Sequence, residues 1–279
     1  MGKVLTTVAT LLVLLVGAAF VAPLLVDWTR HKALVEAEAS RLLGYTVRID
    51  GALDVRLLPS ATIRAEGVRI GSEGAGLTVE VLAADLSVAG LTRGEISITD
   101  LRLEVPRLEF GLDREGRLLD AFDARPLARV AIERVEITEG SIAVTDPRAN
   151  RVHTVSGIGL QGAASSLAGP WRIEGALVHE GTRYGLQLQT GRAGAEGTRV
   201  RLALEPADPP RVIEIEAEAR AIDGRPTLVG QFRWREAGRP EAGEGAPRWR
   251  AEASGEARFD RLTLRDMRLS TGTAERTLA

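Results

Sequence analysis

A two-residue alternation of apolar and polar side chains, sustained along most of the chain, constrains the fold more than any other feature. Between Tyr45 and Pro59 the apolar residues fall two positions apart, with mostly charged neighbours. The apolar set of this segment is Val47, Ile49, Leu53, Val55 and Leu57. Such a period places side chains on one face of a β-strand. Clusters of turn-forming residues recur after it, and no helix of normal length fits between them. We predict a mainly β protein whose strands have one apolar face.

Later segments repeat a unit of two apolar pairs that are separated by two residues. The units are Ile63, Ala65, Val68, Ile70; Ile96, Ile98, Leu101, Leu103; Val130, Ile132, Val135, Ile137; and Leu262, Leu264, Met267, Leu269. In a regular strand the second pair would point to the face opposite the first. Keeping all four side chains on one face requires a β-bulge or a bend at the two intervening residues. We therefore expect a sheet that is bent at these points and that curls.

The amino-terminal segment predicts a membrane anchor. The run from residue 4 to residue 26 has no charge, and as a helix it would cover roughly the 30 Å of a bilayer's hydrocarbon core. Ala22 is followed by Pro23, a poor signal-peptide cleavage site, so we expect the anchor to be retained. Basic residues flank the run almost equally, and charge therefore does not set its orientation. The residues assigned to the anchor are Val4, Leu15 and Leu25 in the run and Trp28 at its interface.

A short helix is predicted between the anchor and the first strand. Asp27 or Thr29 can cap its start, a weak apolar stripe runs along it, and Gly44 follows its last residue, Leu43. The predicted organisation is a transmembrane signal anchor over residues 1–26, an amphipathic helix over 27–44, and a β-groove domain over 45–279. The last repeated unit begins what looks like a further repeat shortly before Ala279, so we expect a fragment, a short paralogue or a deliberately shortened chain.

Composition and motifs argue against catalysis and against nucleic acid as a partner. The chain has no cysteine and a formal net charge of -2, which removes thiol chemistry, thiolate metal sites and an overall basic field. The segment Gly157–Gly162 fits the dinucleotide pattern G-x-G-x-x-G, but no helical pattern follows it. We interpret its glycines as points where a strand bends or approaches its neighbour. The three histidines lack metal-ligand spacing, and Ser141 lacks the second glycine of a nucleophile elbow. No catalytic, cofactor-binding or metal site is predicted.

The order of these elements resembles the AsmA family of Gram-negative envelope proteins, which is related in architecture to TamB and to the bridge-like lipid transfer proteins. The resemblance rests on a membrane helix, then Leu42-Leu43-Gly44, then a G-x-x-V-x-I-x-G strand ending at Gly51, and then Leu57-Leu58-Pro59. The segment from Gly94 to Phe110 and the strand from Gly169 to Gly175 are similar to later parts of the family. The chain departs from the family after Gly116. Many members place Asn, often with Trp, after the corresponding glycine, whereas this chain has Arg117-Leu118-Leu119.

The resemblance implies an elongated, curved antiparallel β-sheet with an apolar groove, a role in outer-membrane biogenesis, and passage of phospholipid acyl chains along the groove. It also implies a single-pass inner-membrane protein with its bulk in the periplasm, and membrane lipids and outer-membrane assembly factors as partners. The residues assigned to the groove lining are Val47, Ile49, Leu53, Val55, Leu57, Ile63, Val68, Ile70, Ile96, Ile98, Leu101, Leu103, Val130, Ile132, Val135 and Ile137.

Two functions from different classes stay open at this point. One is a lipid conduit that solvates acyl chains without chemistry, and the other is a structural or assembly factor that does not transport lipid. An apolar face that is uncovered and contiguous favours binding of lipid or of a partner. An apolar face that is covered by helices or by a second sheet favours the structural function.

Overall fold

The computed structural model describes residues 31–56, 60–72, 75–93, 95–119, 130–194, 197–208, 211–223, 225–236, 249–258, 261–271 and 274–278. The two helices in these ranges are α2 (Lys32–Leu43) and α3 (Val88–Thr92). The strands are β1 (Val47–Ile49), β2 (Leu53–Arg56), β3 (Ala61–Ser72), β4 (Ala75–Leu86), β5 (Ser97–Glu104), β6 (Arg107–Gly111), β7 (Ala131–Asp146), β8 (Arg151–Ala164), β9 (Trp171–His179), β10 (Thr182–Thr190), β11 (Thr198–Pro206), β12 (Arg211–Ile222), β13 (Arg225–Glu236), β14 (Trp249–Arg258), β15 (Arg261–Thr271) and β16 (Ala274–Leu278).

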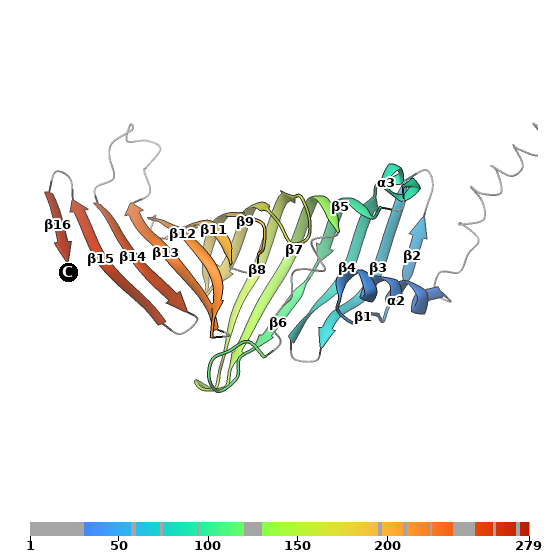
Figure 1. The fold of residues 1–279 in the computed structure, drawn as a ribbon, viewed down its shortest axis with the longest axis horizontal. Coiled ribbons are helices and arrows are strands. Elements are labelled where there is room, and N and C mark those ends of the chain that lie inside the picture. The colour runs from blue at the N-terminus through green and yellow to red at the C-terminus, as the bar shows by residue number, and fades with distance from the viewer. Residues whose placement is uncertain are drawn as a thin grey trace, which may run out of the picture.

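All of these strands join one long, curved sheet, with α2 at one end and β16 at the other (Figure 1). The strand order is β1, β3, β4, β5, and then β7 to β16 in sequence. The short β2 pairs with β3, and β6 pairs with both β4 and β7. Because most neighbours in the sheet are also neighbours in the sequence, most connections are hairpins. The predicted mainly β fold and its curvature are confirmed.

The sheet departs from a purely antiparallel arrangement at one place. β5 and β6 occupy one strand position between β4 and β7 and are separated at Val105, which has φ 50°, and Pro106. Both parts pair with β7 in parallel, with Leu101 opposite Val135 and Leu108 opposite Ile142. A parallel neighbour requires a crossover of a dozen or more residues. The segment 112–130 supplies this connection, and its sequence gave no period from which the parallel pairing could be predicted.

Bends occur where the repeated apolar units predicted them. In β5, pairing with β4 shifts between Ile98 and Asp100, inside the unit that begins at Ile96. In β15, pairing with β14 shifts between Arg265 and Arg268, and Asp266 has φ 53°. Both shifts fall between the two apolar pairs of a unit, which confirms the predicted β-bulges there.

The other two units bend differently. In β3, Gly67 has φ 62° between the two apolar pairs, yet the pairing with β4 keeps its register. The register survives because β4 carries a matching unit that the sequence analysis missed, namely Leu77, Val79, Leu82 and Ala84. In β7, pairing with β8 becomes irregular between Ile137 and Gly140, after the unit rather than within it. The unit in β7 pairs with the unit in β5 without a register shift, and Ile98 lies opposite Ile132.

The predicted end of the first helix is confirmed. α2 ends at Leu43, and Gly44 follows in the left-handed region with φ 74° and donates its N–H to the Ser40 carbonyl at 2.9 Å. Glycine adopts this conformation without the steric cost that a Cβ would bring. The predicted caps Asp27 and Thr29 lie outside the described residues, as do the anchor residues Val4, Leu15, Leu25 and Trp28. Across the ranges that the structure describes, none of the helices has the length and apolar character needed to cross a bilayer.

Candidate functional site

The buried apolar residues of the first half of the sheet form two clusters. The first contains Val47, Ile49, Leu53, Val55, Ala65, Val68 and Val79. Val35, Ala39 and Leu43 of α2 pack against it, so this end of the apolar face is covered by the helix. The second contains Ala84, Leu101, Ile132 and Val135, with Leu167 and Trp171 packed against it. Burial of this apolar area is the main stabilising contribution at the α2 end of the sheet.

Strand pairing aligns apolar residues from distant parts of the sequence into two continuous rows. Row 1 is Val55, Ile63, Ala84, Leu101, Val135, Gly162, Ile173, Leu188, Leu202, Ile215, Phe232 and Ala253. Row 2 is Leu53, Ala65, Leu82, Leu103, Ile137, Leu160, Gly175, Leu186, Leu204, Ile213, Trp234, Ala251 and Leu269. Every residue in each row is directly opposite the next one on the neighbouring strand. Each row therefore contains only apolar side chains and glycine.

The rows extend over most of the molecule. Row 2 runs from β2 to β15 and makes twelve steps between neighbouring strands. At about 4.8 Å per step the row is roughly 58 Å long. One leaflet of a bilayer's hydrocarbon core is about 15 Å thick, half of the 30 Å core. The rows are therefore several times longer than the acyl chain of one lipid.

Cover over the rows changes along the sheet. α2 packs against the first cluster, and the described residues beyond the second cluster contain neither a further helix nor a second sheet. Leu188, Leu202 and Ile215 are accordingly only half-buried. Phe232, by contrast, is 2% exposed, and its ring stacks on Trp234 with 6.2 Å between centroids. The curled sheet thus shields some side chains with their own neighbours and leaves others partly accessible.

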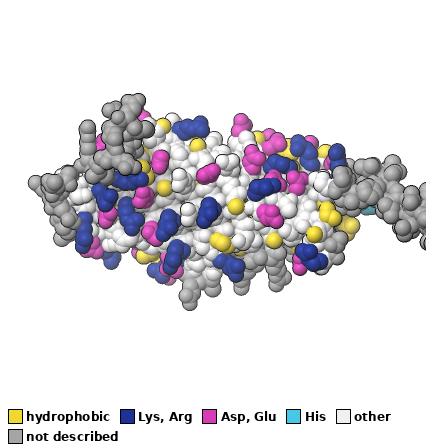
Figure 2. Space-filling model, turned by 90° about the horizontal axis from the view of Figure 1, so that it is seen from above, with side chains coloured by type: hydrophobic (Ala, Val, Ile, Leu, Met, Phe, Trp, Pro, Cys, Tyr) yellow, Lys and Arg dark blue, Asp and Glu magenta, His cyan; other side chains and the backbone are white. Residues whose placement is uncertain are grey.

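The opposite face of the same strands is charged. On β11 to β13, Arg201 donates to Glu216 at 2.8 Å and Arg235 donates to Glu214 at 3.2 Å. The Arg201 guanidinium holds the pKa of the Glu216 carboxyl below its usual range. Figure 2 shows side chains of both signs interspersed along the molecule, with few and scattered hydrophobic groups in that view. The strands β11 to β13 are therefore apolar on one side and ion-paired on the other.

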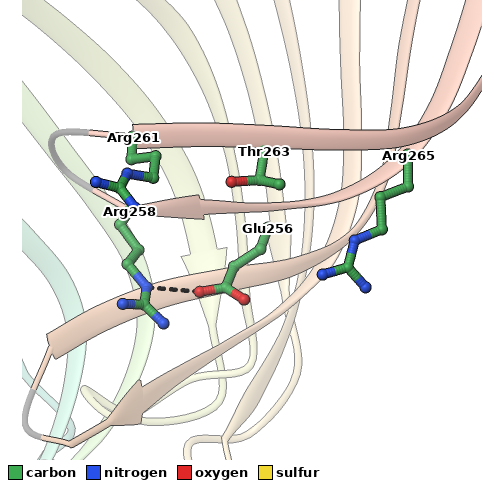
Figure 3. A pocket seen from close by; sticks show the side chains of 5 residues that line it. All are labelled: Glu256, Arg258, Arg261, Thr263 and Arg265. Carbon is green, nitrogen blue, oxygen red and sulfur yellow. Dashed lines mark hydrogen bonds and ion pairs between the residues drawn. The ribbon is translucent and has the colours of Figure 1, made fainter.

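A charged depression of about 170 Å³ lies on the β14–β15 hairpin (Figure 3). Its lining comprises Glu256, Arg258, Arg261, Thr263 and Arg265, and Arg258 donates to Glu256 at 2.5 Å. The β14 members alternate with Gly255 and Ala257, so the depression lies on the polar face. It is not part of the apolar rows.

The structure brings seven of the predicted lining residues into the two rows: Leu53, Val55, Ile63, Leu101, Leu103, Val135 and Ile137. Val47, Ile49, Val68 and Ile70 lie in or against the first cluster at the α2 end. Ile98 and Ile132 pair with each other beside row 1, and Val130 is buried just before β7. Ile96 is half-buried and belongs to neither cluster, and Leu57 lies outside the described residues. A role of these residues in lipid contact stays a prediction.

The sequence analysis missed the second half of both rows. The missed members include Ile173, Leu188, Leu202, Ile215 and Phe232 of row 1. Alternation in 200–206 and 213–219 was a sufficient signal for these strands, since every second residue from Val200 and from Ile213 is apolar.

Gly157–Gly162 lies within β8, and the chain continues there as a strand rather than as a helix. Gly157 has φ 55°, at an irregularity between Ser156 and Gly159. A Cβ at Gly162 would collide with the Arg172 carbonyl oxygen on β9. The interpretation of these glycines as points of bending and close approach is confirmed. Among the described residues, no group of three or more His, Asp or Glu side chains is arranged to hold a metal ion.

Comparison with known proteins gives a family for the chain. Searches of curated proteins and of solved structures returned no match. The AsmA family model matches residues 1–174, which include the predicted anchor, α2 and the strands β1 to β8. This match covers more than half of the 279 residues and agrees with the order of elements in the sequence. The chain therefore belongs to the AsmA family.

Proposed function

We propose that this protein solvates the acyl chains of membrane phospholipids along the apolar rows of its sheet, and that it acts by this contact rather than by catalysis. The observation that carries the proposal is the unbroken alignment of apolar residues over roughly 58 Å. Membership of the AsmA family supports a role in lipid-related envelope biogenesis.

The energetics favour such a path for apolar chains. Each acyl CH₂ kept from water contributes about 0.8 kcal/mol, so even a few methylenes held against the rows lower the free energy of a lipid outside a bilayer. An uninterrupted row lets one contact replace the next without exposing the chain to water. The charged face opposite remains hydrated and keeps the sheet soluble along its length.

We place the protein in the inner membrane through the predicted anchor at residues 1–26, with the sheet in the periplasm and a role in outer-membrane biogenesis. In this arrangement α2 and β1 lie nearest the anchor in sequence, and β15 lies far along the sheet. Lipid would meet the rows at one end and leave them at another. Outer-membrane assembly factors are candidate partners under the same proposal.

A second function, that of a structural or assembly factor, is favoured by one observation. The first cluster is covered by α2, and Val47 and Ile49 are 6% and 7% exposed, as in a closed core. If the whole apolar face were closed in this way, it would stabilise the sheet and bind no lipid. The half-buried residues beyond the second cluster distinguish the two functions.

Photo-crosslinking in cells tests the proposal directly. A photoreactive residue at Leu202 should form phospholipid adducts, because Leu202 lies in row 1 on the stretch without helical cover. The matched control is the same residue at Arg201, its neighbour on β11, whose side chain points to the charged face. Equal labelling at both positions, or no labelling at Leu202, would refute the proposal.

A further inference from the structure

One stripe of α2 makes hydrogen bonds to the backbone of an edge strand. Among the strands that the structure describes, β1 pairs with β3 alone, and none of them lies along its other edge. Glu36 Oε1 accepts the Ile49 N–H at 2.7 Å, and Ser40 Oγ accepts the Val47 N–H at 2.8 Å. Lys32 Nζ donates to the Gly51 carbonyl at 2.6 Å. The helix thus satisfies two N–H groups that the edge strand would otherwise present to another chain, and one carbonyl just beyond the strand.

The spacing of these contacts follows from the geometry of the two elements. Lys32, Glu36 and Ser40 are four residues apart and lie on one helix face, about 6.0 Å from one to the next along the axis. Their partners on the strand are two residues apart, a rise of about 6.8 Å. Because the two rises are similar, three successive side chains of the helix can each reach a backbone group of the segment 47–51, with the helix running antiparallel to that segment. The Ser40 hydroxyl is itself held by the Glu36 carbonyl at 2.6 Å.

The same helix face carries the apolar contacts that hold it in place. Val35, Ala39 and Leu43 pack against the first cluster, beside the polar stripe. Glu38 lies on the exposed side and pairs with Arg41. The polar stripe therefore holds α2 along the edge of β1, and the apolar contacts hold it on the face of the sheet. Substitutions in the stripe should let the helix move off the edge of β1 while the apolar contacts keep the domain folded.

We propose that α2 is an edge cap, whose Lys32, Glu36 and Ser40 occupy the backbone positions at which β1 of a second copy of this chain would pair. This inference is independent of lipid binding. The second copy is the occupant because an edge strand is complementary to itself in an antiparallel pair. Arg48 would be at the centre, since its backbone groups point toward β3 and its side chain is exposed. Two copies of residue 48 would then lie about 4.5–5.5 Å apart between Cβ atoms.

The experiment uses the full chain in detergent, and the absence of cysteine from the sequence provides a clean background for disulfide trapping. Arg48→Cys alone should stay largely uncrosslinked under mild oxidation. Adding Glu36→Ala and Ser40→Ala should produce the disulfide dimer and should raise amide exchange at Val47 and Ile49 about tenfold, the change expected from losing one hydrogen bond. Glu38→Ala is the matched control and should change neither readout.

Single variants keep the test specific to the cap. Ser40→Ala should speed exchange at Val47 and leave Ile49 protected, because Glu36 still accepts from Ile49. Glu36→Gln retains an acceptor oxygen, so the Ile49 amide should stay protected from exchange in this variant, unlike in a variant with Glu36→Ala. The Val79 amide in the core reports that each variant is folded. Dimer formation by Arg48→Cys alone, or unchanged exchange and no dimer in the double variant, would overturn the proposal.

Discussion

A charge introduced into row 1 at two different places should distinguish the covered part of the apolar face from the uncovered part. Leu101 is 8% exposed and packs in the second cluster between Ala84 and Val135. Leu188 lies in the same row on β10 but is only half-buried. We compare Leu101→Asp with Leu188→Asp, because both place a carboxylate in the same row.

The expected costs follow from burial. Leu101→Asp removes three apolar carbons from the cluster, which costs about 2.5 kcal/mol at about 0.8 kcal/mol per carbon, and the cavity adds to this cost. An unpaired polar group adds about 1–3 kcal/mol and an ionised one more, so Leu101→Asp should lower the free energy of unfolding by more than about 4 kcal/mol. Leu188 is half-buried, so Leu188→Asp should lose about half of this stabilisation by apolar burial, and water can solvate the new carboxylate. The expected loss there is about 1.5 kcal/mol.

Urea denaturation followed by circular dichroism, in one detergent and at pH 7, measures both losses. Gln189→Asp is the matched control, since Gln189 is exposed on the charged face and lies opposite Arg172 and Arg201. It should change stability by less than about 0.5 kcal/mol. If Leu188→Asp is as destabilising as Leu101→Asp, the face is closed along its whole length. That result would refute the argument for an accessible path and would favour the structural function.

Two further predictions concern local conformation. Gly162→Ala should destabilise the sheet by about 2 kcal/mol or more, because its Cβ would meet the Arg172 carbonyl, whereas Gly159→Ala, with no atom within 4 Å of the new Cβ, should be nearly neutral. Urea midpoints measure both, and an equal cost would contradict the close approach. Backbone and side-chain hydrogen bonds from Arg117 lower the pKa of Asp113 to about 2 from its ordinary value of 3.8. The stabilisation by this carboxylate is therefore present above about pH 4 and is lost as the pH falls toward 2. Asp113→Asn should be less stable than the wild type at pH 7, and the difference should shrink steadily as the pH falls from about 4 to about 2. A difference that is the same at pH 2 as at pH 7 would show that the carboxylate charge is not its cause.

The candidate face could be predicted only in part from the sequence. Alternation identified which residues of one strand share a side, and it correctly selected Leu101 and Leu103 as members of the apolar face. It could not show that Leu202 and Ile215 continue the same row, because that depends on register between strands. Register is set by hairpin turns and bulges, and a shift of one residue would move every side chain to the other face.

Features that involve only a few neighbouring residues follow from the sequence. Gly44 ends α2 because only a residue without Cβ takes φ 74° at little cost, and the two-residue gap in an apolar unit produces a bulge at Asp266. Which distant segments meet depends on the fold as a whole. β5 pairs in parallel with β7, which begins 27 residues after β5 ends, and Glu36 reaches Ile49 only once α2 has packed along β1. Local conformation follows from the sterics of a few neighbouring residues, whereas contacts between distant segments depend on the whole chain finding one register.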